Sequence, residues 1–185
     1  LMLDRRSPEL VIKLFQLEVP EIGQGIIDLV GASRDPGFRA KIAVRSNDPK
    51  IDPVGACVGI RGAGVQSVSN AINLERIDII TWSENPAEFV IKALQPAEVE
   101  SIVIDEDAQS MDVVVDEAQL SQAIGRQGQN VRLASQLTGW ELNIMTDQAA
   151  AEKSEAESEA ARDRLMEFLD IDHDVALALV DEGFP

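Results

Sequence analysis

Two short glycine pairs constrain this chain more than any other feature of its sequence. The stretches Gly59-Ile60-Arg61-Gly62 and Gly125-Arg126-Gln127-Gly128 each place two glycines three residues apart, with an arginine between them. A glycine has no Cβ, so the backbone turns tightly and a phosphodiester can approach it closely. One such pair occurs easily by chance, but two copies in one chain favour a shared role.

The second glycine of each pair precedes a stretch with helical periodicity, which begins with Val65 in one copy and Val131 in the other. The first N–H groups of a helix have no intrahelical partner, and together with the helix dipole they favour an anion. Arg61 and Arg126 add a cation to each loop. We therefore expect two helix-to-helix junctions that bind phosphate, although either loop taken singly could be a purely structural turn.

The order of the expected elements around the two glycine pairs is the same. The first half has a helix from Ser7-Pro8-Glu9, strands at 25–33 and 39–46, a helix from Asp52-Pro53, the loop, a helix and a strand at 77–82. The second half has a helix from Asn85, strands at 102–105 and 111–115, a helix from Asp116, the loop, a helix and a strand at 140–145. Each half is thus predicted to be α-β-β-α-loop-α-β.

The junction between the halves is short, because Trp82 ends one strand and Pro86 already begins the next helix. With no Gly/Ser-rich tether, we expect a fixed relative orientation of the two halves. Two loops held in register would present one continuous track, and the second would act at high effective concentration once the first has bound.

Net charge is −17, which at first sight argues against a nucleic-acid partner. The charge is unevenly distributed, however. Between Arg34 and Arg76 there are seven Lys/Arg against four acids, whereas from Asp147 to the end there are twelve acids against three basic residues. We therefore expect the acid to be concentrated in a predicted helical tail and the loop regions to be neutral to basic.

The sequence offers little support for catalysis. It has no Gly-x-x-x-x-Gly-Lys-[Ser/Thr] phosphate loop and no nucleophile–histidine pair, so we predict that it is not an enzyme and needs no cofactor. His173 has no partners at ligand spacing, so no metal site is expected. The single cysteine, Cys57, fits a reducing compartment, and without a long apolar run we expect a cytoplasmic chain that does not contact the membrane.

Helix, Gly-x-x-Gly, helix and strand resemble the core of a K-homology (KH) domain, whose loop clamps about four backbone nucleotides of RNA. The order in each half is that of bacterial-type (type II) KH domains. The stretches from Ser46 to Gly62 and from Ala123 to Trp140 resemble the first and second KH domains of the bacterial NusA family of transcription factors. We therefore predict an α+β fold of two tandem type II KH domains followed by a helical acidic segment.

The resemblance implies a division into residues 1–6 (the end of a preceding domain), 7–83 (first KH domain), 84–147 (second KH domain) and 148–185 (helical linker and truncated acidic repeat). It also implies a monomeric internal fragment of a factor that binds nascent single-stranded RNA and RNA polymerase and regulates pausing, termination and antitermination. The partner implied for the acidic tail is the C-terminal domain of the polymerase alpha subunit.

The residues expected to bind RNA lie in the loops and in the helix starts that follow them. They are Gly59, Ile60, Arg61, Gly62 and Val65 in the first half, and Gly125, Arg126, Gln127, Gly128, Asn130, Val131 and Arg132 in the second. The alternative is a protein-docking scaffold on RNA polymerase, in which the KH folds bind RNA weakly or not at all. Ile60, an apolar residue beside Arg61, is a departure that weakens the expected phosphate contact of the first loop.

Overall fold

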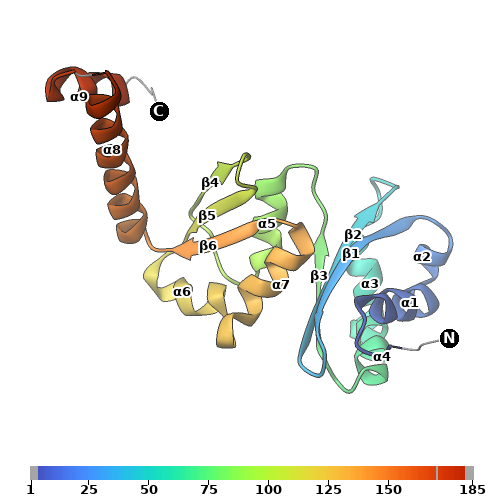
Figure 1. Cartoon of the computed structure of the whole chain (residues 1–185). Helices are drawn as coiled ribbons and strands as arrows, with labels where there is room; N and C mark the ends of the chain where they lie inside the picture. Colours follow the sequence, from blue (N-terminus) through green and yellow to red (C-terminus); the bar gives the residue numbers. More distant parts are fainter. Residues whose placement is uncertain (1–3, 170, 182–185) are drawn as a thin grey trace. The chain divides into compact units, whose positions relative to one another are not determined.

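A computed structural model describes residues 4–169 and 171–181 of the chain (Figure 1). The residues up to Ile144 form one compact unit, and those from Met145 onward form another. Each unit is described by itself. The first unit contains both glycine pairs and both predicted halves, and the second contains the acidic tail.

The first half has the predicted order, with one short extra helix that the sequence did not indicate. Its elements are α1 (Pro8–Glu18), α2 (Pro20–Gly23), β1 (Ile27–Asp35), β2 (Arg39–Ser46), α3 (Pro53–Val58), the 3₁₀ turn η1 (Ile60–Gly62), α4 (Ala63–Ala71) and β3 (Arg76–Thr81). The predicted helix starts are confirmed by their caps. The Ser7 hydroxyl accepts a hydrogen bond from the Glu9 N–H, and the Asp52 carboxylate accepts from two N–H groups of the first turn of α3.

The second half repeats the same order. Its elements are α5 (Pro86–Leu94), β4 (Ser101–Asp105), β5 (Ser110–Val114), α6 (Glu117–Ile124), the 3₁₀ turn η2 (Arg126–Gly128), α7 (Gln129–Thr138) and β6 (Glu141–Met145). Asn85 and Asp116 cap α5 and α6 through their side chains. Gly139 ends α7 in the left-handed conformation, with φ of +78°, as helix-terminating glycines do.

Each half contains a three-stranded sheet, in the order β1-β2-β3 and β4-β5-β6. In the first sheet β1 and β2 are antiparallel and β2 and β3 are parallel. One face of this sheet packs on α1, α3 and α4 through residues such as Ile27, Ile42 and Val44. The register of β1 shifts between Leu29 and Gly31, and this bulge places Gly31 and Ser33 on the opposite face.

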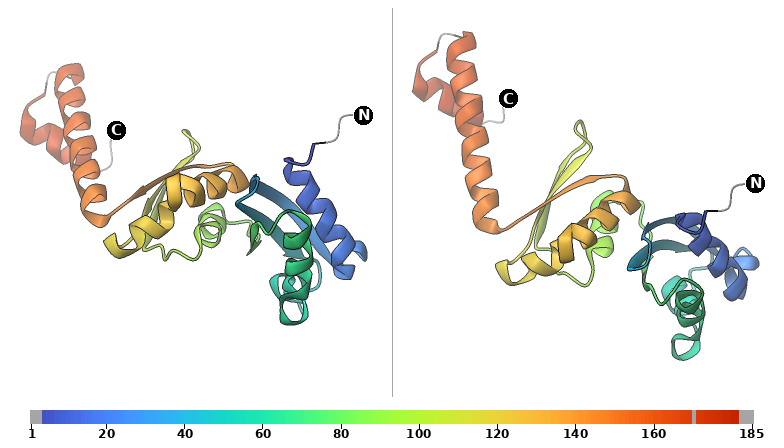
Figure 2. Two further views of the ribbon diagram at one scale, coloured as in Figure 1. Left: turned by 90° about the horizontal axis from the view of Figure 1, so that it is seen from below. Right: turned by 60° about the horizontal axis from the view of Figure 1, so that its bottom comes forward.

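That opposite face of the first sheet is covered by the second half. Helix α7 packs against β1 and β2 (Figures 1 and 2), and the Ser33 hydroxyl donates to the Leu133 carbonyl at 2.7 Å in a buried hydrogen bond. Ala43 and Ile80 of the first sheet belong to the apolar cluster of the second half. The two halves therefore pack against each other directly.

The acidic tail forms two helices, α8 (Asp147–Leu169) and α9 (His173–Asp181). Helix α8 buries none of its described residues, as expected for a solvated Ala/Glu-rich helix, and α9 packs on it with Ala176 fully buried. Gly183, a glycine at which the sequence predicts the end of the last tail helix, lies outside the described residues. In the part of the chain that the structure describes, no helix is both long enough and apolar enough to cross a bilayer.

Candidate nucleic-acid interface

The first glycine loop reverses the chain between α3 and α4 with three residues at positive φ. Gly59 has φ of +74° and ψ of 176°, Arg61 has φ of +55°, and Gly62 has φ of +81° in the left-handed region. The conformation of Gly59 lies in a region that residues with a Cβ essentially never occupy. The first glycine is therefore obligatory, whereas the left-handed conformation of the second carries a smaller penalty for other residues.

Close packing adds a second reason for glycine in this loop. A Cβ on Gly59 would lie 2.9 Å from the Gly64 nitrogen, and a Cβ on Gly64 would lie 2.8 Å from the Cys57 carbonyl oxygen. The start of α4 thus lies directly against the end of α3. Glycine at both positions lets the two helices meet at the loop and fixes where the N-terminus of α4 points.

The second loop has nearly the same backbone. Gly125 has φ of +75° and ψ of 173°, Gln127 has φ of +52°, and Gly128 has φ of +71°. A Cβ on Gly125 would lie 2.8 Å from the nitrogen and the Cβ of Asn130. The two glycine loops, which repeat in the sequence, therefore also share one backbone conformation.

Asn130 supports the second loop from inside. Its side chain is fully buried, and its Nδ2 donates to the Leu94 carbonyl at 2.9 Å and to the Ala123 carbonyl at 3.1 Å. These bonds join the ends of α5 and α6 to the first turn of α7. The sequence pattern predicts Asn130 as an RNA contact, but its side chain does not reach the surface and instead holds the loop through these hydrogen bonds.

The residues between the glycines face solvent. Ile60 is 87% exposed, and Arg61, Arg126 and Gln127 are exposed as well. Within the described residues, neither Arg61 nor Arg126 forms an ion pair, so both guanidinium groups are free to meet an anion. Gly62 and Gly128 are the N-cap residues of α4 and α7, and neither helix start is capped by a side chain. The Gly62 and Ala63 N–H groups donate inside the turn, and Gly128 and Gln129 do the same in the second loop. Each loop therefore presents a helix start without a side-chain cap together with exposed side chains.

The remaining predicted residues line the helices behind the loops. Val65 and Val131 are half-buried and pack on the core of their own half, so each presents only part of its side chain. Arg132 is half exposed, and its guanidinium pairs with the Asp35 carboxylate at 3.1 Å. Asp35 also accepts a hydrogen bond from Gln129 Nε2 at 2.8 Å. The β1–β2 hairpin of the first half thus docks on the N-terminal turn of α7.

A cleft of about 420 Å³ lies where this hairpin meets the second glycine loop. It is lined by Asp35, Phe38, Arg126, Gln127, Gln129 and Arg132. Three of these, Arg126, Gln127 and Arg132, are predicted site residues, whereas Asp35, Phe38 and Gln129 are not predicted from the sequence. Only the proline–glycine turn before Phe38 signals that its side chain would lie at a hairpin tip, and nothing in the sequence pairs that tip with α7.

Among the described residues, neither the single cysteine nor a metal-type cluster contributes to this surface. Cys57 is buried, and burial raises the pKa of its thiol to about 11, so it is a neutral core residue. Among the residues that the structure describes, no cluster of His, Cys, Asp or Glu has the arrangement of a metal site.

Comparison with known proteins identifies both halves. Residues 5–82 match the family model of the NusA-like first KH domain, and residues 86–152 match that of the NusA-like second KH domain. The chain therefore carries two KH domains in tandem, in the α+β arrangement predicted for them. These matches together span well over half of its residues, and the chain belongs to the NusA family.

Curated relatives agree over the whole chain. The transcription termination/antitermination proteins NusA of Rickettsia prowazekii (strain Madrid E) and Rickettsia conorii (strain ATCC VR-613 / Malish 7) are each 46% identical over 187 aligned positions, which include all of this chain. The chain spans 37% of the length of each. The crystal structure of APE1850 is similar in fold, with a TM-score of 0.53 at 18% identity, covering 73% of this chain and 95% of that one.

Proposed function

We propose that the two KH domains bind nascent single-stranded RNA without catalysing a reaction. The observation that carries this proposal is the repeated loop, which in both domains combines a helix N-terminus without a side-chain cap with exposed side chains. Phosphate groups suit such donors, and unpaired bases can lie over the half-buried apolar residues behind them. The proposed contacts are the residues predicted from the sequence, with the Asn130 side chain as a support.

The wider role follows from the family. We infer that this segment belongs to a cytoplasmic elongation factor that regulates pausing, termination and antitermination, and that other parts of the protein contact RNA polymerase. The proposed domain limits are residues 7–83 and 84–147. The acidic tail, whose α8 exposes a row of carboxylates, is proposed to dock on the C-terminal domain of the polymerase alpha subunit.

The second loop provides the direct test. Replacing Arg126 and Gln127 by Asp should weaken binding of a short single-stranded RNA by at least about tenfold, because two like charges then face the phosphates. A matched control replaces Arg164 and Gln148 of α8 by Asp, which changes the net charge equally outside the loops. Fluorescence anisotropy measures affinity, and a circular dichroism melt checks the fold. Unchanged affinity in the loop variant would remove this loop from the site.

The rival function is a protein-docking scaffold with little RNA affinity. Its supporting observation is the acidic net charge, and a salt titration separates the two. RNA binding should weaken linearly on a log–log plot, with a slope of about −0.7 per phosphate contacted, whereas a scaffold would give no saturable binding to titrate.

The acidic tail gives a second test, which compares RNA affinity with and without the tail. If the tail competes with RNA for the basic surface, a chain ending at Thr146 should bind RNA more tightly at low salt than the full chain does. Equal affinities would show that the tail carboxylates do not compete within this segment and would leave protein docking as their role.

A further inference from the structure

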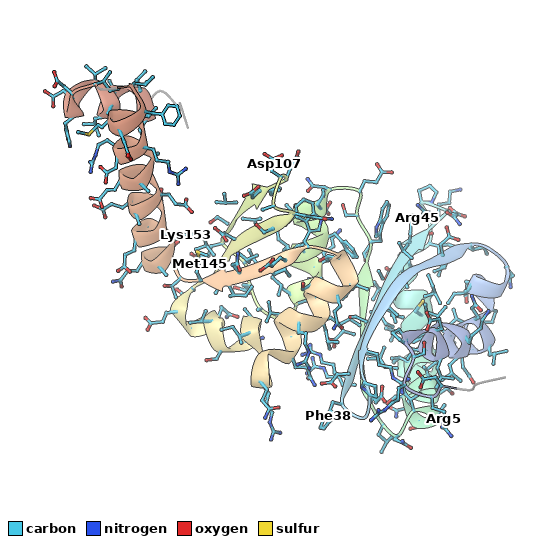
Figure 3. The ribbon with its side chains drawn as sticks, in the orientation of Figure 1. Arg5, Phe38, Arg45, Asp107, Met145 and Lys153 are labelled. Carbon is cyan, nitrogen blue, oxygen red and sulfur yellow. The ribbon has the colours of Figure 1, made fainter. Side chains whose placement is uncertain are left out.

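Phe38 is a large apolar side chain in an unusual position. It lies at the tip of the β1–β2 hairpin and is 68% exposed (Figure 3). Its backbone is nevertheless fixed on both sides, since its N–H donates to the Asp35 carbonyl and its carbonyl accepts from the Arg76 N–H at 3.0 Å. The ring is thus presented to solvent by an ordered turn.

A buried ion pair anchors this turn. The Arg34 guanidinium donates two hydrogen bonds of 2.8 Å to the two carboxylate oxygens of Glu75, and both side chains are almost fully buried. The same carboxylate accepts from the Gly37 N–H at 2.7 Å. Burial acts to raise the pKa of Glu75, but the bonds from Arg34 and Gly37 outweigh it and hold the pKa below its usual value. The carboxylate therefore stays ionised, and the turn that carries Phe38 stays preorganised.

The opposite wall of the cleft belongs to the second domain. Arg132 neutralises Asp35, the one acid that lines the cleft, which leaves the Arg126 guanidinium as a cation without an ion pair among the described residues. Gln127 adds an exposed amide that can both donate and accept. The cleft therefore combines one aromatic face with a free guanidinium and amide groups.

This combination selects among possible occupants. An apolar anchor from a protein partner needs an apolar pocket, but Phe38 is the only apolar residue that lines the cleft. A nucleobase has an aromatic face for stacking, polar edges for amides and an attached phosphate for a guanidinium. The chemistry of the cleft matches a nucleotide in each of these respects.

We infer that one base of the bound RNA stacks on Phe38 in this cleft, while its phosphate contacts Arg126. Phe38 of the first domain then completes the binding site of the second domain's loop, so that neither domain alone provides the full site. This inference rests on the proposed RNA binding and adds to it an aromatic stacking residue that lies outside both glycine loops.

The first measurement compares the RNA affinity of the Phe38→Ala variant with that of the natural chain. Loss of one stacked base should weaken RNA binding by about tenfold. The slope of log affinity against log salt should not change, because no phosphate contact is lost. Leu17→Ala, which removes a side chain that is 81% exposed on α1, is the matched control and should leave affinity unchanged. Phe38→Trp should retain binding because it keeps the aromatic face.

The second measurement uses RNA with an abasic nucleotide placed at each position in turn. With the natural chain, one abasic position should weaken binding as much as Phe38→Ala does, and in the Phe38→Ala variant that same position should have no further effect. If every abasic position costs the same in both proteins, Phe38 does not stack on a base. If the natural chain binds no RNA, the proposed function itself fails. Binding that depends on the Arg126 loop but not on Phe38 overturns only this inference.

Discussion

The two glycine loops have one backbone but different side chains. Their φ angles at equivalent positions differ by 10° or less, the widest pair being Gly62 at +81° and Gly128 at +71°. Between the glycines, the first loop presents Ile60 and Arg61 and the second presents Arg126 and Gln127. The backbone has the same geometry in both, so a difference in RNA affinity between the loops must come from these side chains and from their surroundings.

The loops also differ in what holds them. Gly64 lies five residues after the first glycine of its loop, and Asn130 holds the equivalent position in the second. The first loop is closed by contact of bare backbones, and the second by a buried amide that bonds to two helix ends. The same turn can therefore be specified by the absence of a side chain or by the hydrogen bonds of one, and the expected mutational costs differ accordingly.

The largest expected effect is on stability, and it differs between the two glycines of the second loop. Gly125→Ala should lower the free energy of unfolding by about 3 kcal/mol, because it combines a backbone region reserved for glycine with a contact of 2.8 Å. Gly128→Ala should cost only about 1 kcal/mol, since its Cβ would meet open space and only the left-handed strain remains. Urea denaturation of both variants measures the difference, and equal costs would contradict the account of the first glycine.

The next largest effect on stability is expected from removing the buried Asn130 amide, which supports the second loop. Asn130→Ala should destabilise the chain by about 2 kcal/mol, because the buried Leu94 and Ala123 carbonyls lose their amide donor. Asn70→Ala, at an exposed position of α4, is the control and should change stability by less than about 0.5 kcal/mol. If both asparagines prove equally dispensable, the buried amide does not hold the loop.

The first sheet is packed on both faces, because α7 covers the face opposite the one that packs on α1, α3 and α4. Lys41 is fully buried on that face, with its Nζ 3.3 Å from the Asp78 carboxylate and 3.4 Å from the Gln95 carbonyl. Burial lowers the pKa of Lys41 from 10.5 to about 8, although the Asp78 charge opposes the shift. Arg39 and Arg76 share Asp78, so its single charge faces three cations.

This buried cation predicts a pH effect. Between the folded pKa of about 8 and the unfolded value of 10.5 the unfolded chain binds more protons, so stability rises with pH. The free energy of unfolding should increase by about 1 kcal/mol from pH 7.5 to pH 9, and the Lys41→Met variant should lack this rise. Measurements stop at pH 9.0, the unfolded pKa of Cys57, because the raised folded pKa of this thiol acts in the opposite sense as the unfolded thiol ionises. An identical rise in the variant would assign it to another group.

The smallest expected effect is the change in RNA affinity when a side chain of one loop is given to the other. Ile60→Arg gives the first loop the cation that the second has at this position, so RNA affinity should rise a fewfold and the log–log salt slope should steepen by about 0.7. Arg126→Ile should make the slope shallower by about the same amount. If neither substitution changes the slope, these positions do not contact phosphates, and the comparison of the loops loses its basis.

Most of the fold could be predicted from single residues with strong local preferences. Proline after Ser7, Asp52 and Asn85, and the glycines at the turns, mark element boundaries whatever the tertiary structure. Two copies of one order then limited the possible architectures. The short helix α2 was missed because its four residues, from Pro20 to Gly23, are too few to show a helical period.

The site was less predictable because part of it depends on contacts between distant residues. Asn130 is a polar residue in the first turn of a helix and reads as a surface position, and only the fold brings the Leu94 carbonyl to its amide. Asp35 and Gln129 are 94 residues apart, and no local pattern pairs them. Phe38 follows a turn and gives no signal of the loop it faces.

Crosslinking of bound RNA, followed by mapping of the crosslinked residues, tests the central claim most directly. A short single-stranded RNA with photoreactive bases, bound to the full chain at low salt, should crosslink in both domains, at or beside Gly59–Gly62 and Gly125–Gly128. Crosslinks confined to surfaces away from both loops, such as the exposed strand β4 or helix α8, would contradict the account.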